Sequence, residues 1–161
     1  MTDEKKAGEI VRPADKYPRV PANASLKETL LTIKEQLPNG AAKAALVADG
    51  AGRPFGFITL RGILKALEPP YSKVQDWPVP FFWTGLAAER CARSDRIGIG
   101  DYVEPLRAVS VQAADNLLKV VHAIRQTKHH VLPVMEGDEL VGMIDAGALF
   151  DELCRMVDDH R

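Results

Sequence analysis

The chain has 161 residues, of which 46% are hydrophobic and 27% are charged, and its formal net charge is −1. This length allows one domain or two small units that share a core, and the balanced charge argues against nucleic acid as a main partner. No apolar run approaches the roughly 20 residues that a membrane-spanning helix needs, so no membrane partner is expected.

The first segment, "MTDEKKAGEIVRPADK", is polar and charged and has no apolar signal core. Nothing in it indicates export, and residues 1–16 are expected to be a flexible arm. The two cysteines of the chain are too few for a disulfide scaffold. These features favour a reduced, cytoplasmic protein.

Residues 17–68 read as a short strand, a helix, two strands and a second helix. Ser25 with Glu28 three residues on forms a capping-box pattern for the first helix. The two strands come from "ALVADGAGRPFG" (45–56), where a glycine-containing turn predicts a β-hairpin. Helical spacing predicts that the two helices bury Leu26, Leu30, Ile33, Leu37, Leu60, Ile63, Leu64 and Leu67.

The connecting segment, residues 69–105, is rich in proline and in aromatic side chains. The prolines exclude a regular helix in its first half, and a flexible linker would be less aromatic. Its aromatic residues are expected either to add to the core or the dimer contact, or to form a partner surface; they are Trp77, Phe81, Phe82 and Trp83. A helix and then an extended lead-in, "IGIGDYVEP", are expected to follow.

Residues 106–161 repeat the pattern of residues 17–68. "GFITLRG" begins at Gly56 and "GMIDAGA" at Gly142, and the hairpins before them align at the same separation of 86 positions. Asp115 or Asn116 can cap the helix of the second copy. Its last helix is expected to bury Leu149, Phe150, Leu153 and Met156. The sequence therefore predicts an α+β fold in which two β-α-β-β-α units pack about a pseudo-twofold axis.

These repeated stretches, "LVADGAGRPFGFITLRGILKAL" and "HHVLPVMEGDELVGMIDAGALFDEL", resemble the CBS domain, and the chain resembles a stand-alone tandem CBS pair. The resemblance implies a regulatory module that binds an adenosine-containing ligand (AMP, ADP, ATP or S-adenosylmethionine) in a cleft between the repeats. It also implies a homodimer of flat, disc-like shape.

The resemblance places a hydroxyl beside the ligand at Thr59 and a ribose-binding aspartate three residues later. The second place is taken by Gly62 in the first copy and by Ala148 in the second, where Asp145 replaces the hydroxyl. Thr59 is expected to cap a helix, with or without a ligand contact, and Asp145 is expected to be a helix cap or, in a rearranged pose, a partner of the ribose diol.

Further ligand-binding candidates are Arg61, for phosphate oxygens, and His129, before a strand that lines the cleft in the family. Val47 and Pro133, on strands of the two repeats, complete the candidate set. A metal shared by His129 and His130 is not expected, because neighbours in a strand point to opposite faces.

No nucleophile–base arrangement and no phosphate-binding glycine loop is present, so catalysis is not expected. Two hypotheses follow for the function. In the first, the chain senses a ligand and signals to a separate effector protein. In the second, it is a dimerisation scaffold that has lost nucleotide binding, as Gly62 and Ala148 would suggest.

Overall fold

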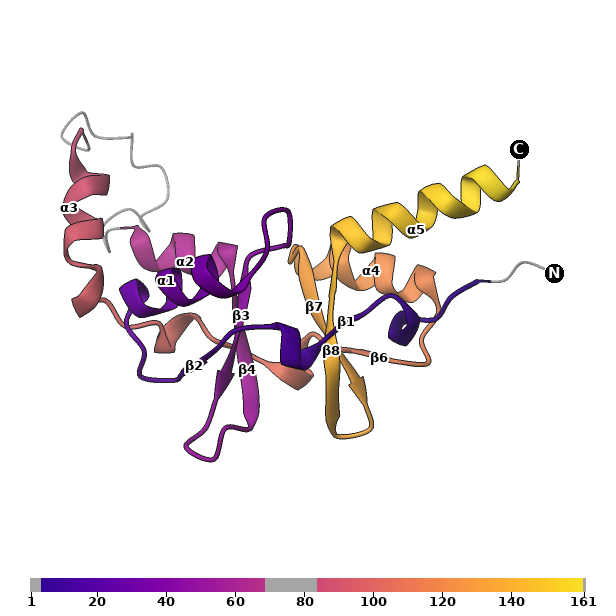
Figure 1. Ribbon diagram of the computed structural model, residues 1–161, viewed down its shortest axis with the longest axis horizontal. Helices are drawn as coiled ribbons and strands as arrows, with labels where there is room; N and C mark the ends of the chain where they lie inside the picture. Colours follow the sequence, from indigo (N-terminus) through magenta and orange to yellow (C-terminus); the bar gives the residue numbers. More distant parts are fainter. Residues whose placement is uncertain (1–3, 69–83, 161) are drawn as a thin grey trace.

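The computed structural model describes residues 4–68 and 84–160 and consists of two similar halves side by side, each with a sheet and two helices above it (Figure 1). The first half contains β2 (Arg19–Pro21), α1 (Leu26–Gln36), β3 (Ala44–Ala48), β4 (Pro54–Thr59) and α2 (Leu60–Leu67). The second contains β6 (Val111–Gln112), α4 (Leu117–Thr127), β7 (Val131–Glu136), β8 (Glu139–Asp145) and α5 (Ala146–Asp159). The predicted α+β order is confirmed in both halves.

The first helix of each half begins at a predicted cap. The Ser25 Oγ accepts a hydrogen bond from the Glu28 N–H at 3.0 Å, and the Asn116 Oδ1 accepts one from the Lys119 N–H at 2.9 Å. Each bond satisfies a backbone donor that has no partner inside its helix. Asn116, rather than Asp115, is therefore the cap of α4.

Each sheet is completed by a short strand that precedes the other half in the chain. The sheet orders are β2-β3-β4-β5 and β1-β8-β7-β6, where β1 is Arg12–Pro13 and β5 is Glu104–Pro105. β1 therefore leads into the first half but pairs with β8 of the second, and β5 leads into the second half but pairs with β4 of the first. This exchange links the two halves in both directions.

Two glycines at equivalent places make this exchange possible. Gly56 lies opposite Pro105, and Gly142 lies opposite Pro13. A Cβ at position 56 would stand 2.8 Å from the Glu104 O, and one at position 142 would stand 2.0 Å from the Arg12 O. The glycine that opens both "GFITLRG" and "GMIDAGA" is therefore needed because another backbone crosses it closely.

For residues 4–16, the described part of the predicted flexible arm, the structure shows ordered contacts instead of a loose segment. Ala7 is fully buried, and its N–H donates to the Asp115 O at 2.9 Å. The Glu4 Oε1 accepts from the Leu117 N–H at the start of α4, and Arg12 belongs to β1. This polar stretch lies against the second half because backbone hydrogen bonds and one buried alanine hold it there.

The connecting segment is described only from residue 84 onward. The aromatic residues at 77 and 81–83, to which the sequence assigned a core or partner role, lie outside the described residues. α3 (Leu86–Ala92) matches the expected helix. Its Arg90 donates to the carbonyls of Leu67 and Ala66, so it satisfies acceptors at the end of α2.

The two halves share a core. Val131, Met135 and Met143 of the second half belong to the buried cluster that fills the first half. The helices depart from the predicted burial, however. Leu30, Leu60, Leu64, Phe150 and Leu153, all predicted to be buried, are exposed. Instead Thr29 in α1, Ala66 in α2 and Glu152 in α5 are buried.

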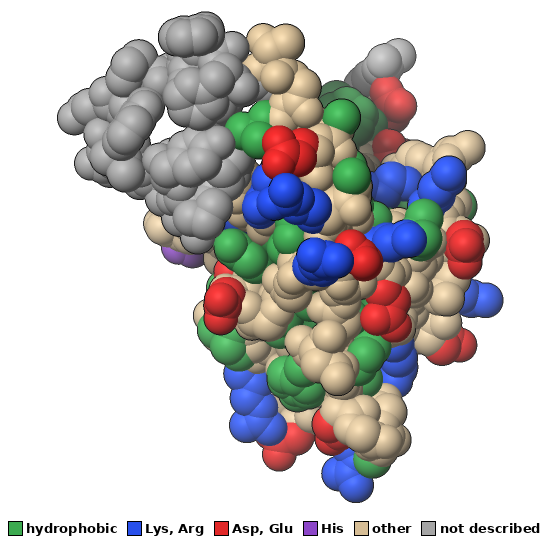
Figure 2. Space-filling model, turned by 90° about the vertical axis from the view of Figure 1, so that its left-hand side faces the viewer, with side chains coloured by type: hydrophobic (Ala, Val, Ile, Leu, Met, Phe, Trp, Pro, Cys, Tyr) green, Lys and Arg blue, Asp and Glu red, His purple; other side chains and the backbone are tan. Residues whose placement is uncertain are grey.

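The large apolar side chains exposed on the described helices are together called here the exposed helical face: Leu30, Leu31, Leu60, Leu64, Leu118, Phe150, Leu153 and Val157. Figure 2 shows one end of the molecule, where acidic and basic side chains are interspersed with hydrophobic ones and no large patch of one sign forms. None of the described helices is long and apolar enough to cross a bilayer.

Candidate functional site

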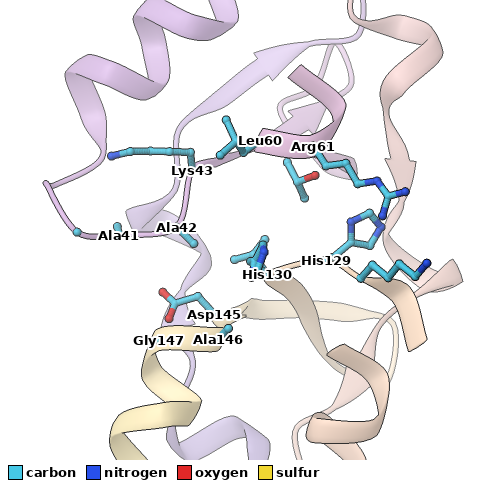
Figure 3. A pocket seen from close by; sticks show the side chains of 14 residues that line it. Ala41, Ala42, Lys43, Leu60, Arg61, His129, His130, Asp145, Ala146 and Gly147 are labelled. Atoms are coloured by element: carbon cyan, nitrogen blue, oxygen red, sulfur yellow. The ribbon is translucent and has the colours of Figure 1, made fainter. Parts of the chain in front are cut away.

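A cavity of about 350 Å³ lies between the two halves. Four segments line it, two from each half: residues 40–43 before β3, 59–61 at the start of α2, 128–131 leading into β7, and 145–147 at the start of α5. Figure 3 shows the side chains of these segments around a common space. The volume falls in the range of small-molecule sites, and equivalent segments meet in it because the halves are related by a pseudo-twofold axis.

The starts of α2 and α5 both reach this cavity, but their capping residues behave differently. The Asp145 Oδ1 accepts a hydrogen bond from the Ala148 N–H at 2.6 Å, so this predicted cap is confirmed. The Thr59 side chain makes no capping bond. Thr59 is 6% exposed and lines the cavity, and within the described chain no residue partners its hydroxyl. Thr59 is therefore the N-cap residue of α2, as predicted, but its hydroxyl takes no part in the capping.

The charge of the cavity lining is mainly positive. Lys43, Arg61 and Lys128 line it, and among the described lining residues Asp145 is the only acid. A helix start adds a partial positive charge through its unpaired N–H groups. The first of these groups is already used in each helix, because the Leu60 N–H donates to the Lys43 O at 3.0 Å and the Ala146 N–H to the His130 O at 2.8 Å. The cationic side chains are thus the main attraction for an anion.

His129 connects this cavity to a side slot of about 70 Å³, which the Thr59, Gly62 and Tyr102 residues also line. The His129 side chain is 10% exposed, and its Nε2 lies 3.9 Å from the Glu104 Oε1. Burial lowers the pKa of His129 although Glu104 opposes the shift. Burial at this place therefore favours the neutral form of the imidazole.

Gly62 stands where the resemblance expects a ribose-binding aspartate, and the structure shows what occupies that space. A Cβ at this position would meet the Ile58 Cγ1 at 3.0 Å and the Tyr102 O at 3.1 Å. The lead-in to β5 therefore crosses close to α2, and an aspartate would fit only if it moved. The side slot offers little room for a ribose on this side.

A further cavity of about 270 Å³ lies in the second half, at the place equivalent to the side slot of the first. Ile10, Val11 and Arg12 from the N-terminal segment line it together with Met143, Asp145 and Ala148. Nearby, burial raises the pKa of Tyr17 to about 12, and the charge of Asp145 adds to this shift. The Tyr17 hydroxyl is therefore neutral across the physiological range.

The structure brings together four of the six candidate ligand residues. Thr59, Arg61, His129 and Asp145 all line the central cavity. Val47 and Pro133 do not, because they are buried within β3 and β7, opposite Gly56 and Met143.

The sequence reasoning missed Lys43 and the lining role of His130. Lys43 lies 86 positions before His129, so the alignment of the repeats could have found it. His129 and His130 both line the cavity, contrary to the alternation expected for a strand, because they precede β7. No group of three metal-ligating side chains occurs among the residues that the structure describes.

Asp145→Ala should lower the free energy of unfolding by about 0.5–2 kcal/mol, because it removes the hydrogen bond to the Ala148 N–H. Asp145→Asn should keep most of that stability, since the amide oxygen can accept the same bond. Urea unfolding of the two variants measures this difference. Equal losses in both would mean that the carboxylate charge, and not the cap, stabilises α5.

Comparison with known proteins agrees with this architecture. The sequence model of the CBS domain matches residues 7–69 and 99–155. No curated protein sequence matches the chain. Among solved structures, the CBS-pair protein CBSX2 from Arabidopsis thaliana superimposes with a TM-score of 0.69 at 17% identity, covering 96% of this chain and 98% of that one.

Two ligand complexes are also similar. CBSX2 in complex with AMP has a TM-score of 0.63 at 18% identity and covers 94% of this chain and 97% of that chain. The cytosolic domain of the Mg²⁺ channel MgtE in complex with ATP has a TM-score of 0.59 at 19% identity, covering 91% of this chain and 48% of that one. At these identities the likeness shows the fold. The family model matches both repeats, and each sheet is completed by a strand that precedes the other repeat in the chain. The chain therefore belongs to the CBS-domain family as a tandem pair.

Proposed function

We propose that the protein is a regulatory module that binds an adenine nucleotide in the central cavity, with the phosphate groups at the start of α2. The observation that carries this proposal is that Thr59 and Arg61 line the same cavity. Thr59 offers a hydroxyl that no described residue uses, and Arg61 offers a guanidinium that suits phosphate oxygens. The similar structures that hold AMP and ATP support this choice of ligand.

The absent ribose clamp affects which nucleotide is preferred. A hydrogen bond to a charged group contributes about 1.5–3 kcal/mol, and position 62 is a glycine close to the Tyr102 O. Affinity must then come mainly from the phosphates and the cationic lining. ATP and ADP are therefore expected to bind more tightly than AMP, and S-adenosylmethionine, which has no phosphate, more weakly than all three.

Signalling would follow from the position of the cavity between the repeats. Residues 59–61 come from the first half and residues 128–131 from the second, so a ligand that contacts both favours one relative orientation of the two. A ligand shifts such an equilibrium only by its difference in affinity for the two states. A separate effector protein would read the change.

A homodimer is supported by the exposed helical face. Leu64 is 52% exposed, Phe150 is 64% exposed and Val157 is 67% exposed, although α2 and α5 each also have a buried side. Large apolar side chains gathered on the helices of both repeats favour contact with a second copy. Cys91 and Cys154 are free and exposed, which supports a reducing compartment such as the cytoplasm.

The second candidate function is a dimerisation scaffold without a ligand. Asp145 favours it, because its carboxylate occupies the start of α5 and repels a phosphate there. Gly62 and Ala148, which cannot bind a ribose diol, favour it too.

Thermal unfolding with and without ligand separates the two functions. ATP at 100 times its dissociation constant should stabilise the protein by about 2.7 kcal/mol, which corresponds to a rise in Tm of roughly 5–10 °C for a chain of this size. At one ligand concentration, the rise in Tm should be larger with ATP and ADP than with AMP, and smallest with S-adenosylmethionine. Arg61→Ala should remove most of the rise, whereas Arg53→Ala, on the exposed turn between β3 and β4, should retain it. No rise with any of the four at millimolar concentration would favour the scaffold.

A further inference from the structure

His129 occupies a junction between the repeats. It follows the C-cap of α4, Lys128, whose φ is 60°, and its ring packs edge-on to that of Phe57 with 6.0 Å between centroids. The ring lines both the central cavity and the side slot. The buried Nδ1 has no hydrogen-bond partner in the described part of the chain.

Charged groups face this ring from several elements. Arg61 and Lys65 of α2 line the side slot with it, and in Figure 3 the guanidinium of Arg61 lies beside the His129 ring. Asp101 and Glu104 reach the slot from the lead-in and β5. Tyr102 also lines the slot. The remaining charged or titratable groups lie around the central cavity: Lys43, Lys128, His130 and Asp145.

Without an anion in the cavity, the surroundings of His129 disfavour a charged imidazole. Burial is the largest cause, Arg61 and Lys65 add to it, and Glu104 alone opposes it among the groups that act on His129. An anion in the cavity would reverse the balance, because it offsets the cation of Arg61 and favours an imidazolium close to it.

We propose that an oxyanion enters the central cavity together with a proton that His129 takes up, so that the site holds its ligand more tightly as the pH falls. This inference deepens the proposed function and rests on it for the identity of the site. The coupling itself requires only an oxyanion, with or without a nucleoside attached. The bound oxyanion would be the phosphate group of the nucleotide.

The direction and size of the coupling follow from proton linkage. Between the pKa of His129 in the protein without ligand and its higher pKa in the complex, the proton must be taken from solution, and affinity should fall up to tenfold per pH unit. Above the higher of the two values neither state is protonated, and the affinity is independent of pH. Below the pKa of His129 in the empty protein, both states are protonated and the affinity becomes independent of pH. The sensitive range lies between these two values.

Sulfate is a suitable probe, because its charge does not change between pH 5 and 8. Imidazole resonances of the full chain, recorded by NMR from pH 5 to 8 and assigned with His129→Gln, give the pKa of each histidine with and without sulfate. We expect sulfate to raise the pKa of His129 and to leave that of His122, which is exposed on α4, unchanged. Sulfate should bind more tightly at pH 5.5 than at pH 7.5, and His129→Gln should remove most of that difference.

Two results would overturn the inference: sulfate that shifts the amide signals of Arg61 while the pKa of His129 stays constant, and no binding of sulfate at 100 mM. Because the pKa is measured on the unaltered protein, the inference is tested even if His129→Gln fails to fold. Coupled sulfate binding without any nucleotide binding would defeat the proposed ligand and leave the proton coupling intact.

Discussion

Gly142→Ala should lower the free energy of unfolding by about 1–3 kcal/mol and release β1 from its sheet. The added Cβ would stand 2.0 Å from the Arg12 O and 2.9 Å from the Val11 Cγ2. The nearest atom is backbone, so it cannot turn away as a side chain would. The strand β1 must move, and the burial of Ala7, which precedes it, is lost as well.

Urea unfolding measures the loss of stability, and hydrogen exchange of the amides of residues 7–13 measures the release of β1. Gly50→Ala is the matched control, because that glycine is exposed and no atom lies within 4 Å of its added Cβ. Slow exchange at residues 7–13 in Gly142→Ala, with a stability like that of the control, would contradict the exchanged pairing of β1 with β8.

If the protein forms the proposed homodimer through the exposed helical face, the double variant Leu64→Glu/Phe150→Glu should convert that dimer into monomers. Both residues belong to the exposed helical face, one in each repeat. Large apolar side chains in the middle of an interface cost about 2 kcal/mol or more each when lost, and every 1.4 kcal/mol is a factor of ten. The dimer dissociation constant should rise on the order of 1000-fold, and the buried carboxylates would add to this.

Sedimentation equilibrium gives the mass of each variant over a range of concentrations. Phe55→Glu is the matched control, because Phe55 is 47% exposed but lies on β4 at the hairpin and not on the helices. The control should remain a dimer. A double variant that remains dimeric, or an unaltered protein that is monomeric at high concentration, would exclude the exposed helical face as the interface.

The order of strands and helices was predictable because each element carries a local signal and occurs twice. Ser25 and Asn116 mark helix starts, and glycines such as Gly137 mark the hairpin turns. The exchange of β1 and β5 was not predictable from periodicity, because both strands have only two residues. Their one signal is the similarity of Val11-Arg12-Pro13 to Val103-Glu104-Pro105.

Burial on the helices was predicted less well. The periodicity of α2 placed Leu60, Ile63 and Leu64 in the core. The structure buries Ile63 as predicted, but it exposes Leu60 and Leu64 and buries Gly62 and Ala66 instead. Apolar residues with helical spacing can face the core or a partner protein, and the sequence pattern is the same in both cases. Helical periodicity therefore indicated an apolar surface without showing what covers it.

The candidate site was partly predictable for a related reason. Thr59 and Asp145 stand at the ends of strands, where the sequence placed helix starts, and the pseudo-twofold axis brings those starts together. Val47 was misplaced because it lies in the middle of β3, whose residues are all buried. Lys43 carries no motif of its own, and its one sequence signal is its alignment with His129 at the repeat separation of 86 positions.

A crystal structure of the protein with ATP tests the central claim most directly. We predict that the phosphate groups lie in the central cavity at the start of α2, with the Thr59 hydroxyl and the Arg61 guanidinium within hydrogen-bonding distance of their oxygens. ATP bound elsewhere, or an empty cavity at a saturating concentration of ATP, would contradict it.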